Sequence, residues 1–577
     1  MQTHPRVPAI LWALAACLPL VHAFDLEPIV GTVPQIIAVL CWACAVLAQG
    51  LAGPGTPFQG VWPKALLSLL AGLALLALTQ SLKFSATPDG GLLAAAALLS
   101  AAAVFWTVSR QARSLPSLAT ALFHGLLLAG LLNALVVLLQ VCKPDWADDI
   151  WVASGALPGR GNGNLRQPNH LATVLLWSAV SLAALVQLGK LRFWAAIPLL
   201  ALLMLALVLS ASRMGMAICL LCGLWAGFDS SMAKYLRRLL ALAPVLALFA
   251  WLVAGTVLAV ASAAPDGDAL ALNQKLTSWS GQSTRVKVWT ETLHLILQNP
   301  LWGVGWGEFN FAWTLSPKSP GQVHYFGNAH NLPLQLAVEL GLVMATVILT
   351  VLVYVCFGAC RSAIKSIGDM ATVKRAALMM IGVVAIHSML EFPLWYVTLL
   401  LPTAMLLGLC AAHSPQQEAV PVAGKRLNSS MIFGALMVVA ASFAAFDYFK
   451  IVPLTFAEAR ASSHLQQEHL KRARSSVLYS WVGYRATARG MPGDPFAVLA
   501  AQYSAHGALD VPLLMIWADA LNAGGHVDEA RFLAQRIAEF SKLEGARYFL
   551  PCQQVDSAPK PYQCMPPDKT LGFRDFR

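Results

Sequence analysis

Residues 117–141 read SLATALFHGLLLAGLLNALVVLLQV, a run of 25 residues without an aspartate, glutamate, lysine or arginine. An α-helix rises about 1.5 Å per residue, so this run is long enough to cross the roughly 30 Å hydrocarbon core of a bilayer. The stretch therefore predicts a membrane-spanning helix.

The composition of the whole chain agrees with this prediction. Of the 577 residues, 58% are hydrophobic and 12% are charged, and the mean hydropathy is +0.64; ordinary soluble domains are roughly 25% charged. Charged residues number 40 in residues 1–449 and 27 in residues 450–577. This distribution excludes a soluble enzyme, a disordered tail or a nucleic-acid binder for most of the chain, and predicts an all-α polytopic membrane protein with a soluble C-terminal part. No nucleic-acid partner is expected, because most of the positive charges behind the net charge of +11 lie in short loops between apolar runs.

Apolar runs of spanning length predict about 13 transmembrane helices. The runs are 8–23, 29–49, 63–82, 91–109, 117–141, 170–188, 191–209, 213–228, 239–263, 334–358, 376–391, 393–412 and 430–449. The first is short, and Val21-His22-Ala23 resembles a signal-peptidase site, so a cleaved leader is the alternative there. In either case residue 24 begins outside, and the remaining topology is unchanged.

Basic residues in alternate loops set the orientation. Fifteen lie in one set of loops: Arg6, Lys64, Arg110, Arg113, Lys190, Arg192, Lys234, Arg237, Arg238, Arg361, Lys365, Lys374, Arg375, Lys425 and Arg426. The opposite short loops hold five: Lys83, Lys143, Arg160, Arg166 and Arg213. By the positive-inside rule the N-terminus is cytoplasmic. The chain then divides into N-terminal transmembrane helices (1–160), transmembrane helices with glutamine- and arginine-containing outer turns (161–263), a large outer loop (264–333), C-terminal transmembrane helices (334–449) and an outer domain (450–577).

The outer domain is predicted to be helical. Residues 456–476 and 511–543 show helical spacing, and residues 518–530 resemble one tetratricopeptide-type helix–turn–helix, which is weak evidence for a repeat array. Cys552 and Cys564 lie twelve positions apart, and an oxidising outer compartment would favour a disulfide over two unpaired thiols. The two C-x-x-C pairs inside apolar runs, at 41–44 and 219–222, are better explained as packed hydrophobic residues than as metal or redox sites.

Polar residues that suggest chemistry gather at the predicted outer ends of the spans. They form the groups 166–170, 210–213, 330–331 and 387–396, together with Arg285 and Lys287 at the start of an amphipathic stretch with Val286, Trp289, Leu293 and Ile296 on one face. Within the tenth span, Asn331, Gln335 and Glu339 recur every four residues and share one helical face. This polar stripe lines a cavity, or it is an interhelical hydrogen-bond stripe with a structural role, or both.

Several of these stretches resemble a known family. Residues 330–341, HNLPLQLAVELG, resemble the H-N-x(7)-E-x-G signature of the bacterial O-antigen ligase and polymerase superfamily, and Ser283-Thr284-Arg285 with residues 299–305, NPLWGVG, resembles the start of the same domain. Residues 166–172, RQPNHLA, resemble a segment of the protein O-oligosaccharyltransferase branch, which glycosylates pilin and other exported proteins. The resemblance covers about 160–450.

The resemblance implies a multi-span helical fold of the membrane glycosyltransferase type. It also implies transfer of a glycan from a polyprenyl-pyrophosphate carrier to an acceptor at the periplasmic face of the bacterial inner membrane, with no cofactor, metal or nucleotide sugar. Arg213 and Arg285 resemble the paired arginines that would meet the pyrophosphate, and His330 would take the proton of the acceptor hydroxyl. Gln167 and Tyr396 would orient glycan or acceptor. Further substrate-contacting candidates are Asn169, His170, Asn331, Glu339 and Glu391.

Each role has a simpler alternative. Arg213 could be an interfacial anchor, Arg285 could solvate its helix, and Tyr396 could belong to an interfacial aromatic belt. His330 could cap a helix, although Asn331 is the better cap, and His324 is a second candidate base. Asp266-Gly267-Asp268 has the D-x-D spacing of metal-dependent transferases, but a solvated turn explains it more simply.

The acceptor decides between related functions. An exported, pilin-like protein would make the chain a protein glycosyltransferase, and lipid A–core would make it an O-antigen ligase. An O-antigen polymerase is a further rival, and a transporter would also suit many spans with polar groups. The polar residues crowd one face rather than the midplane, which speaks against a transporter.

Overall fold

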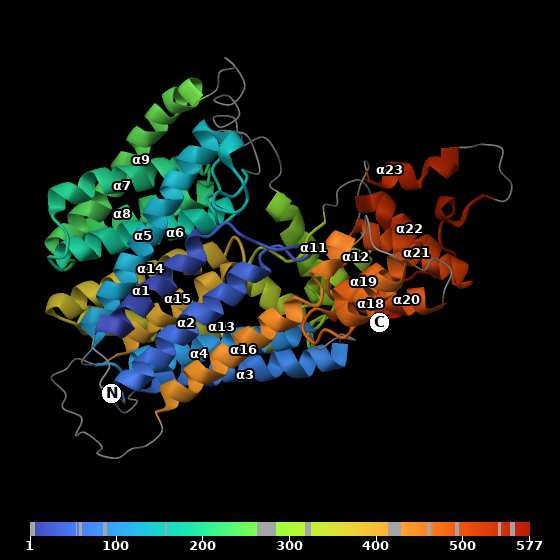
Figure 1. Cartoon of the computed structure of the whole chain (residues 1–577), viewed down its shortest axis with the longest axis horizontal. Coiled ribbons are helices and arrows are strands. Elements are labelled where there is room, and N and C mark those ends of the chain that lie inside the picture. Colours follow the sequence, from blue (N-terminus) through green and yellow to red (C-terminus); the bar gives the residue numbers. More distant parts are fainter. Residues whose placement is uncertain are drawn as a thin grey trace. The chain divides into compact units, whose positions relative to one another are not determined.

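The computed structural model describes residues 6–577 apart from 54, 57–59, 85–88, 113, 156–158, 262–283, 318–324, 413–427, 458–462, 491–494, 541–543 and 554–559. The regular elements of this described part are helices, as the sequence predicts (Figure 1). The D-x-D residues Asp266 and Asp268, and also His324, lie outside the described residues.

Each of the thirteen predicted apolar runs forms a helix. The helices are α1 (Arg6–Val21), α2 (Thr32–Ala52), α3 (Val61–Phe84), α4 (Asp89–Ser109), α5 (Leu115–Cys142), α6 (Pro168–Gln187), α7 (Phe193–Leu209), α8 (Arg213–Phe228), α9 (Lys234–Ala261), α13 (Leu332–Lys365), α14 (Gly368–Ser388), α15 (Val397–Ala411) and α16 (Ser429–Tyr448). Nine helices in the described residues are long and apolar enough to cross a membrane. Helices α1, α7, α8 and α15 are apolar but shorter. The chain is therefore a polytopic membrane protein.

The helices group into two compact units built from separated segments. Unit 1 comprises 1–70, 99–281 and 351–442, and unit 2 comprises 71–98, 282–350 and 443–577. In unit 1, α6 is the central helix and packs against α5, α7, α8, α9 and α14. Helix α1 packs against α2 and α5, with Trp12, Ala16 and Leu20 buried. Because α6 is surrounded by helices, the turn at its start is held between neighbours.

Unit 2 contains the outer-domain helices. These are α17 (Pro453–Ala457), α18 (Ser463–Arg474), α19 (Ser480–Gly490), α20 (Pro495–Ala505), α21 (Val511–Ala523), α22 (Val527–Phe540) and α23 (Glu544–Tyr548). From α18 to α22 each helix packs against the next. Of the helical stretch predicted over 456–476, the described residues form the end of α17 and α18, and residues 458–462 lie outside the described residues. The helix–turn–helix predicted at 518–530 is confirmed: α21 and α22 are joined by a turn at Gly524 and Gly525, in which Gly525 adopts a φ of +84°.

Two buried carboxylates fasten the outer domain to the apolar helices of unit 2. Asp447, near the end of α16, accepts hydrogen bonds from the Ser476 hydroxyl and the backbone N–H of Val477 and Leu478, at 2.7–2.8 Å. Asp89, the first residue of α4, accepts one from the Ser480 hydroxyl at 2.8 Å. The helix ends predicted to face outward are therefore the ends that carry the predicted outer domain.

Cysteine pairing matches the sequence prediction. Cys552 and Cys564 form a disulfide. Cys219 and Cys222 are buried free thiols, and the Sγ of Cys219 lies 3.7 Å from the Sδ of Met204, as expected of packed hydrophobic residues.

Candidate active site

Three turns of unit 1 meet around Asn169. They are the start of α6, the turn between α7 and α8, and the turn between α14 and α15. The Ser212 hydroxyl donates to the Asn169 Oδ1 at 2.7 Å, and the Asn169 amide donates to the Glu391 Oε1 at 3.2 Å. One amide thus joins three segments that are far apart in the chain.

Rings from the same turns pack beside Asn169. The His170 ring lies 4.4 Å from the Tyr396 ring and 5.5 Å from the His387 ring, both edge to face. His387 also shares a 2.8 Å hydrogen bond with the Thr173 hydroxyl. Tyr396 therefore packs onto the predicted site, in addition to any interfacial role.

Gln167 caps the N-terminus of α6. Its Oε1 accepts the backbone N–H of His170 at 2.7 Å, which caps the helix, and Pro168 occupies the first turn. The side-chain oxygen of Gln167 is therefore engaged by the backbone. Its predicted contact with glycan or acceptor would fall to the amide nitrogen.

The loop before Gln167 is held by amides from within the apolar stretch 117–141. Asn133 of α5 donates to the Leu20 carbonyl at 2.8 Å and accepts the Asn164 N–H at 3.0 Å. Gln140 of α5 donates to the carbonyls of Ala153 and Gly163. A role for these two amides was not predicted from the sequence. Their position inside a long apolar run was the available indication, because a polar side chain there needs a hydrogen-bond partner.

Arg166 belongs to this loop. It forms an ion pair with Asp149 at 2.8 Å and donates to the Ala23 carbonyl at 2.9 Å. Its φ is +56°, and Ala211 and His330, at two other predicted site turns, also have positive φ, both +49°. Non-glycine residues adopt this left-handed region uncommonly and at a cost. The predicted site turns are therefore among the strained parts of the backbone.

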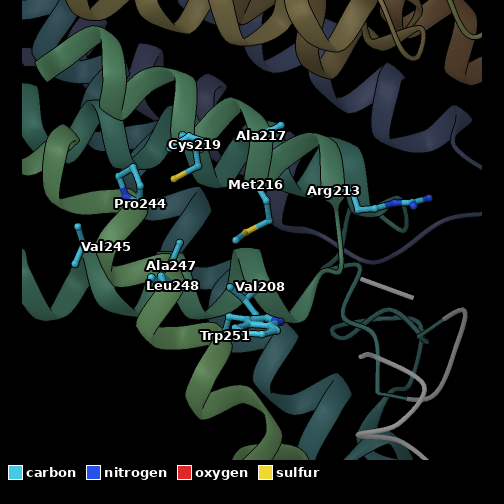
Figure 2. Close-up of a pocket in the computed structure, with 11 residues that line it drawn as sticks. Val208, Arg213, Met216, Ala217, Cys219, Pro244, Val245, Ala247, Leu248 and Trp251 are labelled. Atoms are coloured by element: carbon cyan, nitrogen blue, oxygen red, sulfur yellow. The ribbon is translucent and has the colours of Figure 1, made fainter. Parts of the chain in front are cut away.

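Arg213 stands at one end of an apolar groove. The groove has a volume of about 620 Å³ and lies along α7, α8 and α9. Its lining includes Met216, Leu220, Val245, Leu248 and Trp251. Figure 2 shows Arg213 at the end of α8, beyond the apolar side chains that occupy the rest of the view. An exposed cation beside a groove with this apolar lining suits a ligand with an anionic head and a hydrocarbon tail.

In unit 2, His330 lies just before α13 in a segment fixed from several sides. Its backbone N–H donates to Asn328 Oδ1 at 3.0 Å, and its ring packs edge to face against Phe326 at 5.8 Å. Asn331 Oδ1 accepts the Leu334 N–H at 3.0 Å, so Asn331 is the helix cap. The capping role is thus filled by Asn331, and His330 is half-buried.

Helix α11 (Thr284–Gln298) brings Arg285 toward this segment. The Trp289 indole N–H donates to the Ala329 carbonyl at 3.1 Å, and Arg285 is one helical turn before Trp289 on the same face. The apolar face expected for this helix is rotated relative to the face that the structure buries. Val286 and Leu293 are 55% and 48% exposed, whereas Val288, Thr292 and Leu295 are buried. Two of the four expected residues do face the protein: Ile296 is buried, and Trp289 donates its indole N–H to the Ala329 carbonyl.

The polar stripe of α13 is used within the protein. Gln335 accepts the Ala329 N–H at 2.7 Å and donates to Glu339 at 2.9 Å. Glu339 also accepts backbone hydrogen bonds from Gly307 and Phe309 and is 5% exposed. This geometry favours the structural reading, in which the stripe ties the His330 segment to the loop before α12 (Phe309–Leu315).

Helix α13 is broken at Gly341, two residues after Glu339. Gly341 has φ +79° and ψ 165°, and the loop 300–305 fills the break. The backbone N–H groups of Val304 and Gly305 donate to the carbonyls of Val338 and Glu339 at 2.8 and 2.9 Å. A Cβ on Gly341 would lie 2.2 Å from the Leu301 carbonyl oxygen. The two segments NPLWGVG and ELG, which carry part of the family resemblance, are therefore hydrogen-bonded to each other through their backbones.

The structure brings the predicted site residues together in two groups. Unit 1 holds Gln167, Asn169, His170, Arg213, Glu391 and Tyr396, and unit 2 holds Arg285, His330, Asn331 and Glu339. Within the described residues, no three His, Cys, Asp or Glu side chains are arranged to hold a metal ion.

Comparison with known proteins covers both groups. The family described as O-antigen ligase matches residues 198–349, which include Arg213, Arg285 and His330. Protein glycosylation ligase matches residues 163–186, and the C-terminal family of virulence factor membrane-bound polymerases matches 375–542. The chain belongs to the O-antigen ligase superfamily.

A curated relative supports the protein-glycosylating branch of this superfamily. The general O-oligosaccharyltransferase of Acinetobacter baylyi (strain ATCC 33305 / BD413 / ADP1) is 27% identical over 283 residues, which are 48% of each chain. The alignment thus spans about half the length of that relative. The superfamily and branch expected from HNLPLQLAVELG and RQPNHLA are confirmed.

Proposed function

We propose that the chain is an O-linked oligosaccharyltransferase. It would move a glycan from a polyprenyl-pyrophosphate carrier to Ser or Thr hydroxyls of exported, pilin-like proteins, at the periplasmic face of a bacterial inner membrane. The observation that carries this proposal is the placement of Arg213 at the end of an apolar groove within a chain of the O-antigen ligase superfamily. The groove offers a place for the polyprenyl chain, and the arginine offers a partner for its pyrophosphate.

In the proposed reaction, the acceptor oxygen attacks the anomeric carbon of the glycan. The bond between that carbon and the pyrophosphate oxygen breaks, and the carrier leaves as polyprenyl pyrophosphate. Guanidinium groups of Arg213 and Arg285 offset the negative charge that develops on the leaving group. The acceptor proton passes to an imidazole nitrogen of His330. Because the carrier supplies an activated leaving group, the proposal needs neither a nucleotide sugar nor a metal.

Three features support the proposed side of the membrane. The short loops differ in basic residues by fifteen to five. The outer domain is attached to the ends of α4 and α16 that this bias assigns to the outside. The same domain carries the Cys552–Cys564 disulfide, which is typical of an oxidising compartment.

The acceptor is tested by deleting the gene in the source bacterium. We expect glycosylated forms of exported proteins to disappear while the lipopolysaccharide ladder stays intact. Loss of the ladder with intact glycoproteins would assign the chain to O-antigen ligation, which the match to the O-antigen ligase family also favours. Loss of ladder length alone would indicate a polymerase. A purified protein that moves a labelled glycan from lipid carrier to a Ser-containing peptide would establish the proposed transfer directly.

A further inference from the structure

A second arginine of unit 1, Arg160, lies in the loop before α6 and contacts the turn that precedes Arg213. Its Nε–H donates to the Ser210 carbonyl at 2.9 Å, and the next residue, Gly161, donates its N–H to the Leu209 carbonyl at 3.0 Å. Gly161 itself is pressed against α5, since a Cβ there would lie 2.6 Å from a methyl group of Val137. The backbone that carries Arg160 is therefore fixed between α5 and the end of α7.

Arg160 is partly buried beside the positive charge of Arg213. Burial, followed by the positive charge of Arg213, lowers the pKa of Arg160. An arginine stays protonated in spite of such a shift, so two like charges are held near each other.

Two helix N-termini converge on the same place. Helix α8 begins at Arg213 and α6 begins at Pro168, and the hydrogen bond from Ser212 to Asn169 joins their first turns. Helix N-termini carry partial positive charge and favour anions. Arg160, Arg213 and both helix ends therefore contribute positive potential around the turn between α7 and α8, and the Glu391 carboxylate that accepts from the Asn169 amide is the opposing charge there.

We propose that Arg160 and Arg213 act as a pair that binds the pyrophosphate of the lipid carrier. This inference rests on the proposed function for the identity of the carrier, whereas the anion site itself does not depend on it. The Ser210 carbonyl holds the Nε–H and fixes the plane of the Arg160 guanidinium, and the terminal amino groups are then the ones that meet phosphate oxygens. Arg160 is a substrate-binding residue in this arrangement, and Ser210 positions it.

The test measures binding of inorganic pyrophosphate to the purified full-length chain by calorimetry at low salt. Arg160→Ala should weaken binding roughly 10- to 100-fold, the usual range for a charge-assisted hydrogen-bonding partner. Arg160→Lys should retain part of the affinity, because it keeps the charge. Arg160→Gln should bind as weakly as Arg160→Ala, because it keeps a donor for Ser210 but loses the charge.

The matched control is Arg237→Ala. Arg237 is an arginine of the same unit that also donates to backbone carbonyls, those of Ala226 and Gly227, at 3.0 and 2.9 Å. This variant should bind pyrophosphate like the unchanged protein. Arg160→Gln binding as tightly as the unchanged protein would overturn the proposal, because it would reduce Arg160 to a support for the turn. If Arg160→Ala does not fold, the comparison of the Lys and Gln variants still decides.

A transfer assay separates this inference from the proposed function. With lipid-linked donor and peptide acceptor, Arg160→Ala should raise the KM for the donor more than it lowers kcat. Pyrophosphate binding that depends on Arg160, in a protein that transfers nothing to peptides, would refute the proposed acceptor and support the anion site. Peptide transfer by the unchanged protein, with pyrophosphate binding unaffected by Arg160→Ala and Arg160→Gln, would support the proposed acceptor and refute the role of Arg160 in the anion site.

Discussion

Replacing Asn310 by alanine should release the segment that carries His330 from the outer domain. Asn310, in α12, accepts the Leu509 N–H at 2.8 Å and donates to the carbonyls of Leu509 and Phe326 at 3.3 and 3.4 Å. Phe326 in turn packs against the His330 ring. One amide therefore connects the turn before α21 with the backbone four residues ahead of the candidate base.

The size of the effect follows from these bonds. The 2.8 Å bond contributes about 1 kcal/mol, and the two longer bonds together contribute about as much again. Alanine also leaves the N–H of Leu509, a fully buried residue, without its acceptor. A loss of about 2 kcal/mol corresponds to roughly a 30-fold shift toward the undocked segment. If His330 acts only from the docked segment, kcat falls in proportion to the docked fraction, by up to this factor when docking is marginal, while the KM for the donor changes little.

The assay is hydrogen exchange of the peptide that covers 325–331, measured together with transfer. Asn310→Ala should speed exchange there, and Asn310→Asp should have a smaller effect because its oxygen still accepts the Leu509 N–H. Asn299→Ala is the control: Asn299 donates to the Leu295 carbonyl and accepts from Arg574, so its loss should loosen the C-terminal residues instead. Faster exchange at Leu509 with unchanged exchange at 325–331 and unchanged kcat would refute the coupling.

Four further outcomes are expected. Arg213→Ala and Arg285→Ala should each reduce transfer sharply in protein that still inserts, and lysine should restore only part of it because it lacks the planar bidentate fork; full activity in either alanine variant would remove that arginine from the site. His330→Ala should lower turnover by about 10²–10⁴-fold while lipid-linked donor still accumulates; near-normal turnover with purified substrates would leave His330 a positioning role. Reporter fusions at residues 230, 300, 365 and 500 should read inside, outside, inside and outside, and a cytoplasmic signal at 500 would contradict the proposed periplasmic chemistry. The Ser154 N–H, the Ser154 hydroxyl and then Arg166 lower the pKa of Asp149, so its stabilisation of the loop before α6 is complete above the usual aspartate range and is lost as the pH falls through the lowered value. Asp149→Asn should therefore remove the acid-dependent part of hydrogen exchange across 149–166. An unaltered acid response in this variant would contradict the assignment.

The helices of this protein were predictable because length and hydropathy alone decide whether a segment can cross a bilayer. One helix end was predicted from a local cap, at Asn331 before α13, whereas the predicted sixth span began at residue 170 and the cap at Gln167 was not foreseen. The face of α11 that is buried was not predictable from the sequence. Its apolar residues occur on two faces, and the buried one is chosen by contacts with residues that are distant in sequence. Spacing within a helix cannot supply that information.

The two groups of site residues show the same limit. Spacing by four correctly placed Gln335 and Glu339 on one face, but it could not show that their partners are the backbone groups of Ala329, Gly307 and Phe309. The break at Gly341 lets the loop 300–305 pair with the opened backbone of α13, and Gly307 and Phe309 follow shortly after that loop. A glycine in the middle of an apolar helix was the available signal, because only a residue without a Cβ can adopt φ +79° with a carbonyl oxygen 2.2 Å from the Cβ position. The glutamate and glycine of the ELG sequence thus have linked tasks: Gly341 opens the helix for the loop, and Glu339 holds the loop beside the segment that carries His330.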